Sequence, residues 1–164
     1  MNQPVAYEDA VNLLDADHKA VKQMFTAYGA LCEDGAPASH KLALAHKICQ
    51  ALSVHAQIEE EIFYPPVRTA LHDDILMDEA FAEHAQAKDL IAKIEAMKPT
   101  SPSYDPTIKE LGKLIDGHVL KEREQIFLKA SRAAMDLRGM TFPLMKRQKQ
   151  LTKKVSDAVA KEVA

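Results

Sequence analysis

Two pairs of side chains in this sequence have the types and the spacing of metal ligands. His55 lies four residues before Glu59, and His118 lies four residues before Glu122. Residues four apart on an α-helix lie on one face, about 6 Å apart along the axis, so each pair can direct an imidazole and a carboxylate at a common point. Such ligands suit iron, manganese or zinc.

Each pair is preceded by a further histidine, His18 for the first pair and His84 for the second. The order His, then His-x-x-x-Glu therefore occurs twice. The two pairs are 63 residues apart and the two single histidines are 66 residues apart. This recurrence indicates two copies of a helical hairpin.

The elements that must position these residues can be predicted from proline. Because proline ends or kinks a helix, and the stretches between prolines are rich in Ala, Leu, Lys, Glu and Gln, we predict long helices between them. The predicted helices lie near 6–33, 38–64, 73–98 and 106–135, with a shorter one near 144–161, and the loops at 35–37, 65–74 and 99–105. Short loops join antiparallel neighbours, so the predicted fold is all-α: an up-down-up-down four-helix bundle with a C-terminal extra helix.

The apolar period of each helix identifies its inward face. The four stripes include Leu14, Val21 and Phe25; Leu44, Ile48, Leu52 and Ile62; Leu76, Phe81, Ile91 and Ile94; and Ile108, Leu111, Ile115 and Ile126. Polar residues interrupt them in register: His18, His55, Glu59, His84, His118 and Glu122. Six such groups in one core layer need a common partner, because unpaired buried ions are costly, and a metal is that partner. The alternative, surface His-Glu contacts and two core histidines, leaves the shared register unexplained.

The motifs also resemble a known family. They are His18, His55-Ala56-Gln57-Ile58-Glu59-Glu60-Glu61-Ile62-Phe63-Tyr64-Pro65, Glu83-His84 and His118-Val119-Leu120-Lys121-Glu122. With them the sequence resembles the hemerythrin-like HHE cation-binding domain over about residues 10–130. The resemblance implies a non-haem di-iron site, oxo- or hydroxo-bridged, in which Glu59 and Glu122 bridge the ions and the four histidines are terminal ligands. Manganese or zinc could substitute for iron.

The sequence differs from the oxygen carriers of that family, which carry a second histidine on the third helix and His-x-x-x-x-Asp on the fourth. Here the turn neighbours of His84 are Ala80 and Lys88, and position 123 is Arg123. Two roughly octahedral ions with a bridging oxygen would keep about two positions open, unless Lys88, Tyr64 or a further glutamate fills one. A more open site favours reaction or sensing over reversible transport.

Three functions follow as hypotheses. The first is a non-haem di-iron protein that binds, senses or reacts with O2, peroxide or nitric oxide, with peroxidase, catalase-like or nitric-oxide-reactive turnover left open. The second is an iron store, scavenger or regulator without turnover. The third is a helical interaction module without a metal.

The composition is that of a folded domain. The chain has 164 residues, of which 47% are hydrophobic and 27% charged, so neither disorder nor a membrane protein is expected. The N-terminal Met1-Asn2-Gln3-Pro4 lacks the features of a secretory signal, which favours a cytoplasmic location. Cys32 and Cys49 are expected to be buried thiols rather than a disulfide framework.

The charge is unevenly distributed. Residues 1–136 hold 14 Lys and Arg against 22 Asp and Glu, whereas residues 137–164 hold 7 against 2. We therefore divide the chain into a hemerythrin-like bundle, 1–136, and a basic helical tail, 137–164. The stripe of Leu144, Leu151 and Val155 favours packing of this tail on the acidic bundle, and binding of nucleic acid or an anionic membrane is the alternative.

The expected partner is a small diatomic or peroxide ligand, with neither nucleic acid nor a membrane as the leading interpretation. The sequence does not fix the oligomeric state. Glu60 and Glu61 turn away from the core, which favours solvated charges, with a role as acceptors behind the ligands as the alternative. Three histidines lie off the inward stripes and are expected at the surface: His40, His46 and His72.

Overall fold

The computed structural model describes residues 7–163, with side chains described up to residue 157. Every regular element in this range is helical. The elements are α1 (Ala10–Glu33), α2 (Ala38–Ile58), the π-helix η1 (Glu59–Phe63), α3 (Tyr64–Leu71), α4 (Asp74–Ala96), α5 (Tyr104–Lys121), the π-helix η2 (Glu122–Phe127), α6 (Leu128–Arg132) and α7 (Thr141–Val163).

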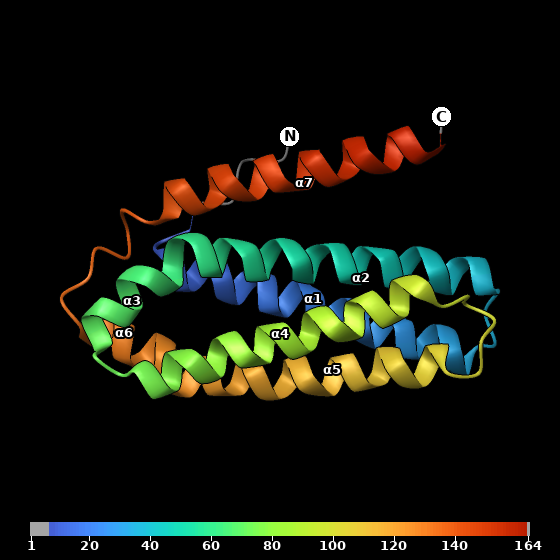
Figure 1. The fold of residues 1–164 in the computed structure, drawn as a ribbon, viewed down its shortest axis with the longest axis horizontal. Helices are drawn as coiled ribbons and strands as arrows, with labels where there is room; N and C mark the ends of the chain where they lie inside the picture. The colour runs from blue at the N-terminus through green and yellow to red at the C-terminus, as the bar shows by residue number, and fades with distance from the viewer. Residues whose placement is uncertain (1–6, 164) are drawn as a thin grey trace.

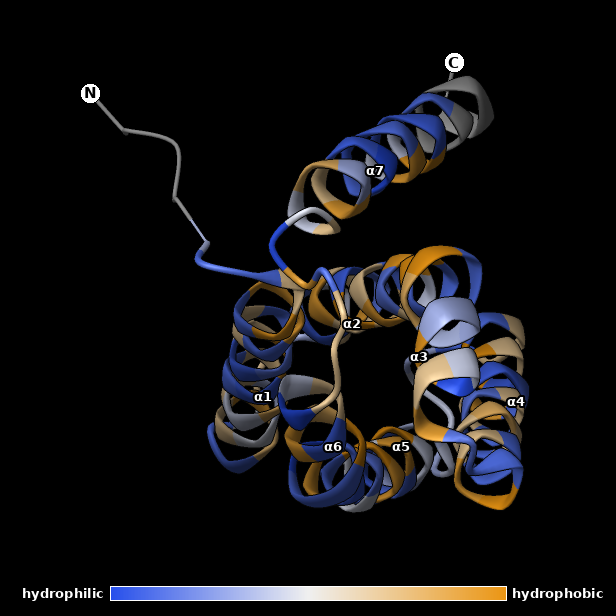
Figure 2. Cartoon of the chain, turned by 90° about the vertical axis from the view of Figure 1, so that its left-hand side faces the viewer, coloured by the Kyte–Doolittle hydropathy of each residue, from blue (hydrophilic) through white to orange (hydrophobic). Residues whose placement is uncertain are grey.

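Four antiparallel rods form the body of the molecule (Figure 1). The second rod is α2 continued by η1 and α3, and the fourth is α5 continued by η2 and α6. Viewed end-on, α1, α2, α4 and α5 occupy the corners of a square in chain order (Figure 2). The predicted all-α, up-down-up-down bundle with an extra C-terminal helix is therefore confirmed.

Short polar side chains fix where two of the rods begin. The carboxylate of Asp9 accepts a hydrogen bond from the backbone N–H of Asn12 at 2.9 Å, and Asp73 accepts one from Leu76 at 3.1 Å. Each satisfies a backbone donor that the first helical turn leaves unpaired. Consequently α1 begins at Ala10, and the earlier start predicted at residue 6 lies outside the described residues.

The predicted loop over 65–74 is wrong, because the chain remains helical through Pro65 and Pro66 to Leu71. The prolines occupy the first turn of α3, where a missing N–H costs little, and the wider turn of η1 comes directly before them. The rod ends at His72, whose φ of 52° is left-handed, and α4 follows at once.

The apolar core consists of two clusters, one toward each end of the bundle. One contains Leu13, Ile58 and Met77, and the other contains Ile48, Ile94 and Leu111, all of which are at most 1% exposed. His18, His84, His118 and Glu122 lie between the two clusters along their rods, and on the second rod His55 and Glu59 lie just past the boundary, among residues of the first cluster. Burial on both sides therefore holds this polar layer in place.

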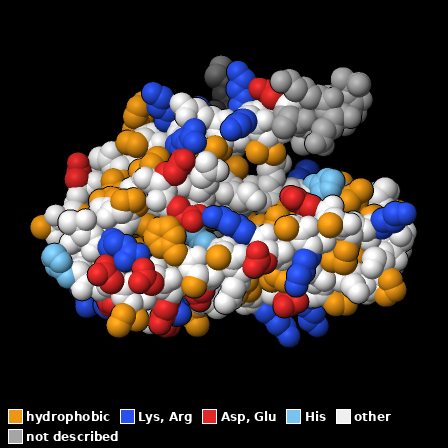
Figure 3. All heavy atoms as spheres, viewed as in Figure 1, with side chains coloured by type: hydrophobic (Ala, Val, Ile, Leu, Met, Phe, Trp, Pro, Cys, Tyr) orange, Lys and Arg blue, Asp and Glu red, His pale blue; other side chains and the backbone are white. Residues whose placement is uncertain are grey.

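The last helix, α7, packs along α2 and η1 on the outside of the bundle (Figure 1). Leu144 and Leu151 of α7 are buried on the side that faces the bundle. Arg147 of the same helix donates a hydrogen bond to Glu61 at 2.8 Å. The described part of α7 therefore packs on the bundle through Leu144 and Leu151. Lys146, Lys149, Lys153 and Lys154 are exposed, and blue Lys and Arg side chains lie along the top of the space-filling view (Figure 3).

Within the described residues, no helix is both long enough and apolar enough to span a bilayer.

Candidate metal centre

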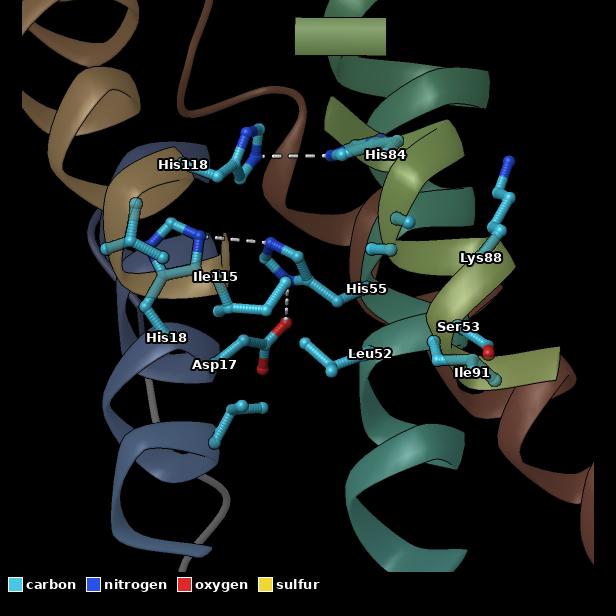
Figure 4. Close-up of a pocket in the computed structure, with 14 residues that line it drawn as sticks. Asp17, His18, Leu52, Ser53, His55, His84, Lys88, Ile91, Ile115 and His118 are labelled. Carbon is cyan, nitrogen blue, oxygen red and sulfur yellow. Dashed lines mark hydrogen bonds and ion pairs between the residues drawn. The ribbon is translucent and has the colours of Figure 1, made fainter. Parts of the chain in front are cut away.

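The four rods bring all six predicted ligand residues into one buried layer. Each histidine is 5–7% exposed, and Glu59 and Glu122 are both 0% exposed. The rings enter from four different rods, with His18 facing His55 and His84 facing His118 (Figure 4). The residues that the sequence placed in one layer are therefore neighbours in space.

The inward nitrogens of the histidines lie at the spacing of ligands on one ion. The Nε2 atoms of His18 and His55 are 3.1 Å apart, and those of His84 and His118 are 3.2 Å apart. Adjacent ligands of an octahedral ion with bonds of about 2.1 Å are separated by about 3.0 Å. Both pairs therefore fit two adjacent positions around a metal.

Carboxylate oxygens complete the two sets. Glu59 Oε1 lies 3.0 Å from His55 Nε2 and 3.3 Å from His84 Nε2. Glu122 places Oε1 at 3.2 Å from His18 Nε2 and Oε2 at 3.3 Å from His118 Nε2. The result is two groups of four ligand residues that share both glutamates, His18, His55, Glu59 and Glu122 in one and Glu59, His84, His118 and Glu122 in the other.

The donor set fits a cation better than it fits hydrogen bonding. Both oxygens of Glu59 and Oε1 of Glu122 are buried, and within the described part of the chain they accept no hydrogen bond. Buried carboxylates without donors are costly, and a cation at the convergence of these oxygens and the Nε2 atoms would remove that cost. These six residues are therefore suited to hold metal ions.

A second row of carboxylates lies behind the histidines, one against each outward Nδ1 atom. The four contacts are His18 with Asp15 at 3.3 Å, His55 with Asp17 at 3.1 Å, His84 with Glu60 at 3.5 Å and His118 with Glu83 at 3.0 Å. An Nδ1–H that faces a carboxylate leaves Nε2 free to bind a metal and increases its basicity.

This second row corrects one expectation. Glu60 is not a solvated charge, because its side chain is 21% exposed, lies behind His84, and accepts from Lys88 at 3.0 Å. Glu61 does lie at the surface. The wide turn of η1, which begins at Glu59, changes the direction in which the following residues point, and a regular 3.6-residue period does not predict that change.

Sequence reasoning missed the other three second-row residues, although a signal was present. Asp17 precedes His18 and Glu83 precedes His84, so an acidic residue next to the single histidine recurs at the same 66-residue separation. Each of these acids serves the histidine of the following rod, His55 or His118. The twofold repeat of the histidine and glutamate pattern therefore extends to the second row of carboxylates.

The charged groups of the layer shift one another's pKa values. Burial opposes the charging of His55, but Glu59 and Asp17 outweigh it and raise the pKa of this imidazole well above its usual value. Burial likewise opposes the charging of His118, yet Glu122 and Glu83 raise its pKa to about 10. Burial would raise the pKa of Glu122, but contacts with His118 and His18 hold it well below the usual value. Without metal, His55 and His118 therefore keep their protons to a higher pH than an ordinary histidine does.

Tyr64 also reaches the layer. Its hydroxyl donates to Glu122 Oε2 at 2.5 Å and lies 3.3 Å from His84 Nε2. Burial, and then the nearby carboxylates of Glu122 and Glu59, raise the pKa of this phenol well above its usual value. Tyr64 therefore holds its proton against the carboxylate of Glu122.

Both glutamates stand at the first residue of a π-helix, Glu59 in η1 and Glu122 in η2. A π-turn inserts an extra residue into a helix and frequently marks a functional site. The next aromatic residues are Phe63, four positions after Glu59, and Phe127, five positions after Glu122, and both are buried.

A small cavity of about 30 Å³ borders the polar layer. All four histidines line it, together with apolar side chains that include Leu52, Ile91 and Ile115 (Figure 4). That volume exceeds the 10–15 Å³ needed by one water molecule but admits little more than a diatomic molecule or a peroxide.

The three remaining histidines play no part in the layer. His40, His46 and His72 are exposed, as their positions off the inward stripes predicted. Neither cysteine belongs to either group of ligands: Cys49 is buried and Cys32 is half-buried, and both are free thiols.

A four-rod helical bundle whose interior places four imidazoles around two shared carboxylates defines a cation-binding helical domain. The chain belongs to the hemerythrin HHE cation binding domain family, whose model matches residues 9–130.

Two further proteins are similar to this chain. A solved hemerythrin HHE cation binding domain-containing protein from Mycobacterium kansasii has a similar fold, with a TM-score of 0.74 and 20% identity, covering 89% of this chain and 88% of that one. A DNA nickase from Nostoc sp. is 30% identical over 81 residues, which is 49% of this chain but only 23% of that protein.

Proposed function

We propose that this protein holds two non-haem iron ions and uses them to bind, sense or react with O2, peroxide or nitric oxide. The observation that carries this proposal is the pair of four-residue groups that share Glu59 and Glu122. One ion in either group would leave two histidine nitrogens of the other group without a cation. A second ion uses all six side chains.

The ligand chemistry favours iron. The layer offers imidazole and carboxylate without thiolate, a mixture that suits iron, with manganese or zinc as substitutes. Glu59 and Glu122 would bridge the ions, and His18, His55, His84 and His118 would be terminal ligands. Iron so held supplies redox chemistry toward a small bound molecule.

The chain's own residues would govern access and protonation. The apolar side chains of the cavity exclude bulk water from the four histidines and limit the bound molecule to about the size of O2, nitric oxide or peroxide. Asp17 and Glu83 orient His55 and His118 through Nδ1. The hydroxyl of Tyr64 holds a proton against Glu122, where it can stabilise negative charge or donate the proton.

Anaerobic loading with Fe(II) tests the proposal. Wild-type protein should retain two iron ions per chain and develop a charge-transfer absorption on exposure to air or peroxide. His55→Ala should lower the iron content, whereas His46→Ala, which removes an exposed histidine of the same helix, should not. Wild-type protein that holds well under two ions, or that shows no optical change, would rule the proposal out.

Turnover distinguishes a reactive centre from a store. Catalytic loss of peroxide or nitric oxide that disappears in Glu122→Gln identifies an enzyme. Stoichiometric uptake followed by release of iron identifies the storage or regulatory alternative, which uses the same ligands.

A further inference from the structure

Among the side chains described, α7 contacts the second row of carboxylates through one polar residue, Gln148. Gln148 donates from Nε2 to both carboxylate oxygens of Asp17, each at 3.1 Å, and Asp17 Oδ2 lies 3.1 Å from His55 Nδ1. Two contacts therefore connect an element outside the four-helix bundle to one ligand histidine inside it.

The position of Gln148 on α7 is unusual for an amide. It lies four residues after Leu144 and three before Leu151, the two buried leucines with which α7 packs on the bundle. Residues at this spacing share one face of a helix. An apolar side chain would serve packing there, so the amide requires a polar partner, and Asp17 is that partner.

Asp17 also differs from the other three second-row carboxylates in what holds it. Asp15 contacts Arg123, Glu60 contacts Lys88 and Glu83 contacts Lys121. Each of those contacts neutralises part of a negative charge. Gln148 is neutral, so it orients Asp17 and leaves the full charge of the carboxylate directed at His55.

The contact is confined to one of the two ligand groups. His55 belongs to the group with His18, whereas His84 and His118 are backed by Glu60 and Glu83. Gln148 has no hydrogen bond to either of those two acids among the contacts of the described residues. An effect transmitted through Gln148 must therefore fall first on the His18 and His55 group.

We infer that Gln148 is a positioning residue for the metal centre: by holding Asp17 against His55 it sets the affinity of the ion in the His18 and His55 group and leaves the ion in the other group unchanged. This inference rests on the proposed two-ion centre. On this inference α7 contributes to metal binding in addition to packing on the bundle.

The test compares Gln148→Leu with Gln150→Leu. Leucine at 148 keeps the packing face of α7 apolar and removes only the donor to Asp17, whereas Gln150 is exposed and contacts Arg147 of its own helix. Stepwise binding of Fe(II) is measured anaerobically in competition with a chromophoric chelator. Loss of an outer partner of a metal ligand typically costs 10–100-fold in affinity.

We expect Gln148→Leu, which acts on His55 only through Asp17, to weaken one of the two binding steps by about 3- to 10-fold and to leave the other unchanged, with Gln150→Leu like wild type. In an Asp17→Ala background Gln148→Leu should add nothing, because the acceptor of its amide is already removed. Unchanged steps, an equal loss in both steps, or a full additional loss in the Asp17→Ala background would each overturn the inference.

A measurement on the metal-free protein separates this inference from the proposed function. In 15N-labelled protein, the Nδ1–H signal of His55 should be slow to exchange in wild type and broadened in Gln148→Leu, with the His118 signal unchanged. Wild-type protein that binds fewer than two iron ions contradicts the function alone, while an unaltered His55 signal in Gln148→Leu contradicts the positioning role. If Gln148→Leu does not fold, Gln148→Glu keeps the shape and repels Asp17, and the same broadening is expected.

Discussion

At the scale of single residues, the polar layer of four histidines and two glutamates leaves several buried carboxylate oxygens without a hydrogen-bond donor among the described residues. Glu59 is fully buried, and both of its oxygens lack a donor among the described residues, although two imidazoles lie within 3.3 Å of one of them. A fold based only on hydrogen bonds would not leave such atoms in its core. A cation would account for these buried carboxylate oxygens, whereas packing alone does not.

Two tyrosines form a matched pair for measuring one polar contact. Tyr64 donates to Glu122, whereas the hydroxyl of Tyr104 is buried without a partner within the part of the chain described. Tyr64→Phe should destabilise the metal-free protein by about 1–3 kcal/mol, because it leaves a buried carboxylate oxygen without its donor. Tyr104→Phe should be neutral or stabilising. Urea unfolding of both variants checks this, and equal losses would contradict it.

The pH dependence of metal-free stability follows from the shifted pKa values. The raised pKa values of His55 and His118 stabilise the fold fully below the ordinary value of 6.5, and this contribution disappears as pH rises toward about 10. The lowered pKa of Glu122 stabilises above 4.5, a contribution that is lost as pH falls. Urea midpoints of metal-free protein should therefore be highest between pH 4.5 and 6.5. A midpoint that increases from pH 6.5 to 9 would contradict this.

At the scale of elements, regular helices were predictable and irregular ones were not. The inward register of His18 and His84 follows from an apolar period of 3.6, which the sequence displays directly. The π-turns at Glu59 and Glu122 interrupt that period, so neither the continuation through Pro65 nor the direction of Glu60 could be predicted from it. A wide turn is stabilised by the packing of other rods against it, which a single helix does not reveal.

The attachment of α7 can be tested with two apolar residues at its start. Leu144 is fully buried, whereas Phe142, two residues earlier, is 73% exposed. Leu144→Ala should destabilise the protein by about 2–5 kcal/mol through the cavity it creates. Phe142→Ala should change stability by less than about 0.5 kcal/mol. Thermal or urea unfolding measures both, and comparable effects would show that α7 does not dock by this face.

At the scale of the whole molecule, the six predicted ligands come together because the two halves of the chain repeat. The equal spacing of His55 with His118 and of Glu59 with Glu122 made that convergence predictable. The recurrence of Asp17 and Glu83 before the single histidines marks two of the second-row acids, but the histidine that each contacts depends on how far each rod is rotated against its neighbour. The docking of Gln148 on Asp17 belongs to the same kind of contact.

Removal of metal should lower the stability of the whole bundle. Ligand that binds only the folded state stabilises it by about 2.7 kcal/mol at 100 times its Kd, which for a chain of this size corresponds to about 5–10 °C in Tm. Calorimetry of loaded and metal-free protein should show a decrease of this order. His40→Ala, which alters only an exposed histidine, should show the same decrease. Identical Tm values for the two forms would support the helical interaction module instead.

The 30 Å³ space beside the histidines has a consequence for exchange. A polydentate scavenger such as EDTA is far larger than that space. We therefore expect departure of the cation to be limited by transient separation of the helices, at a rate that stays constant however much scavenger is added.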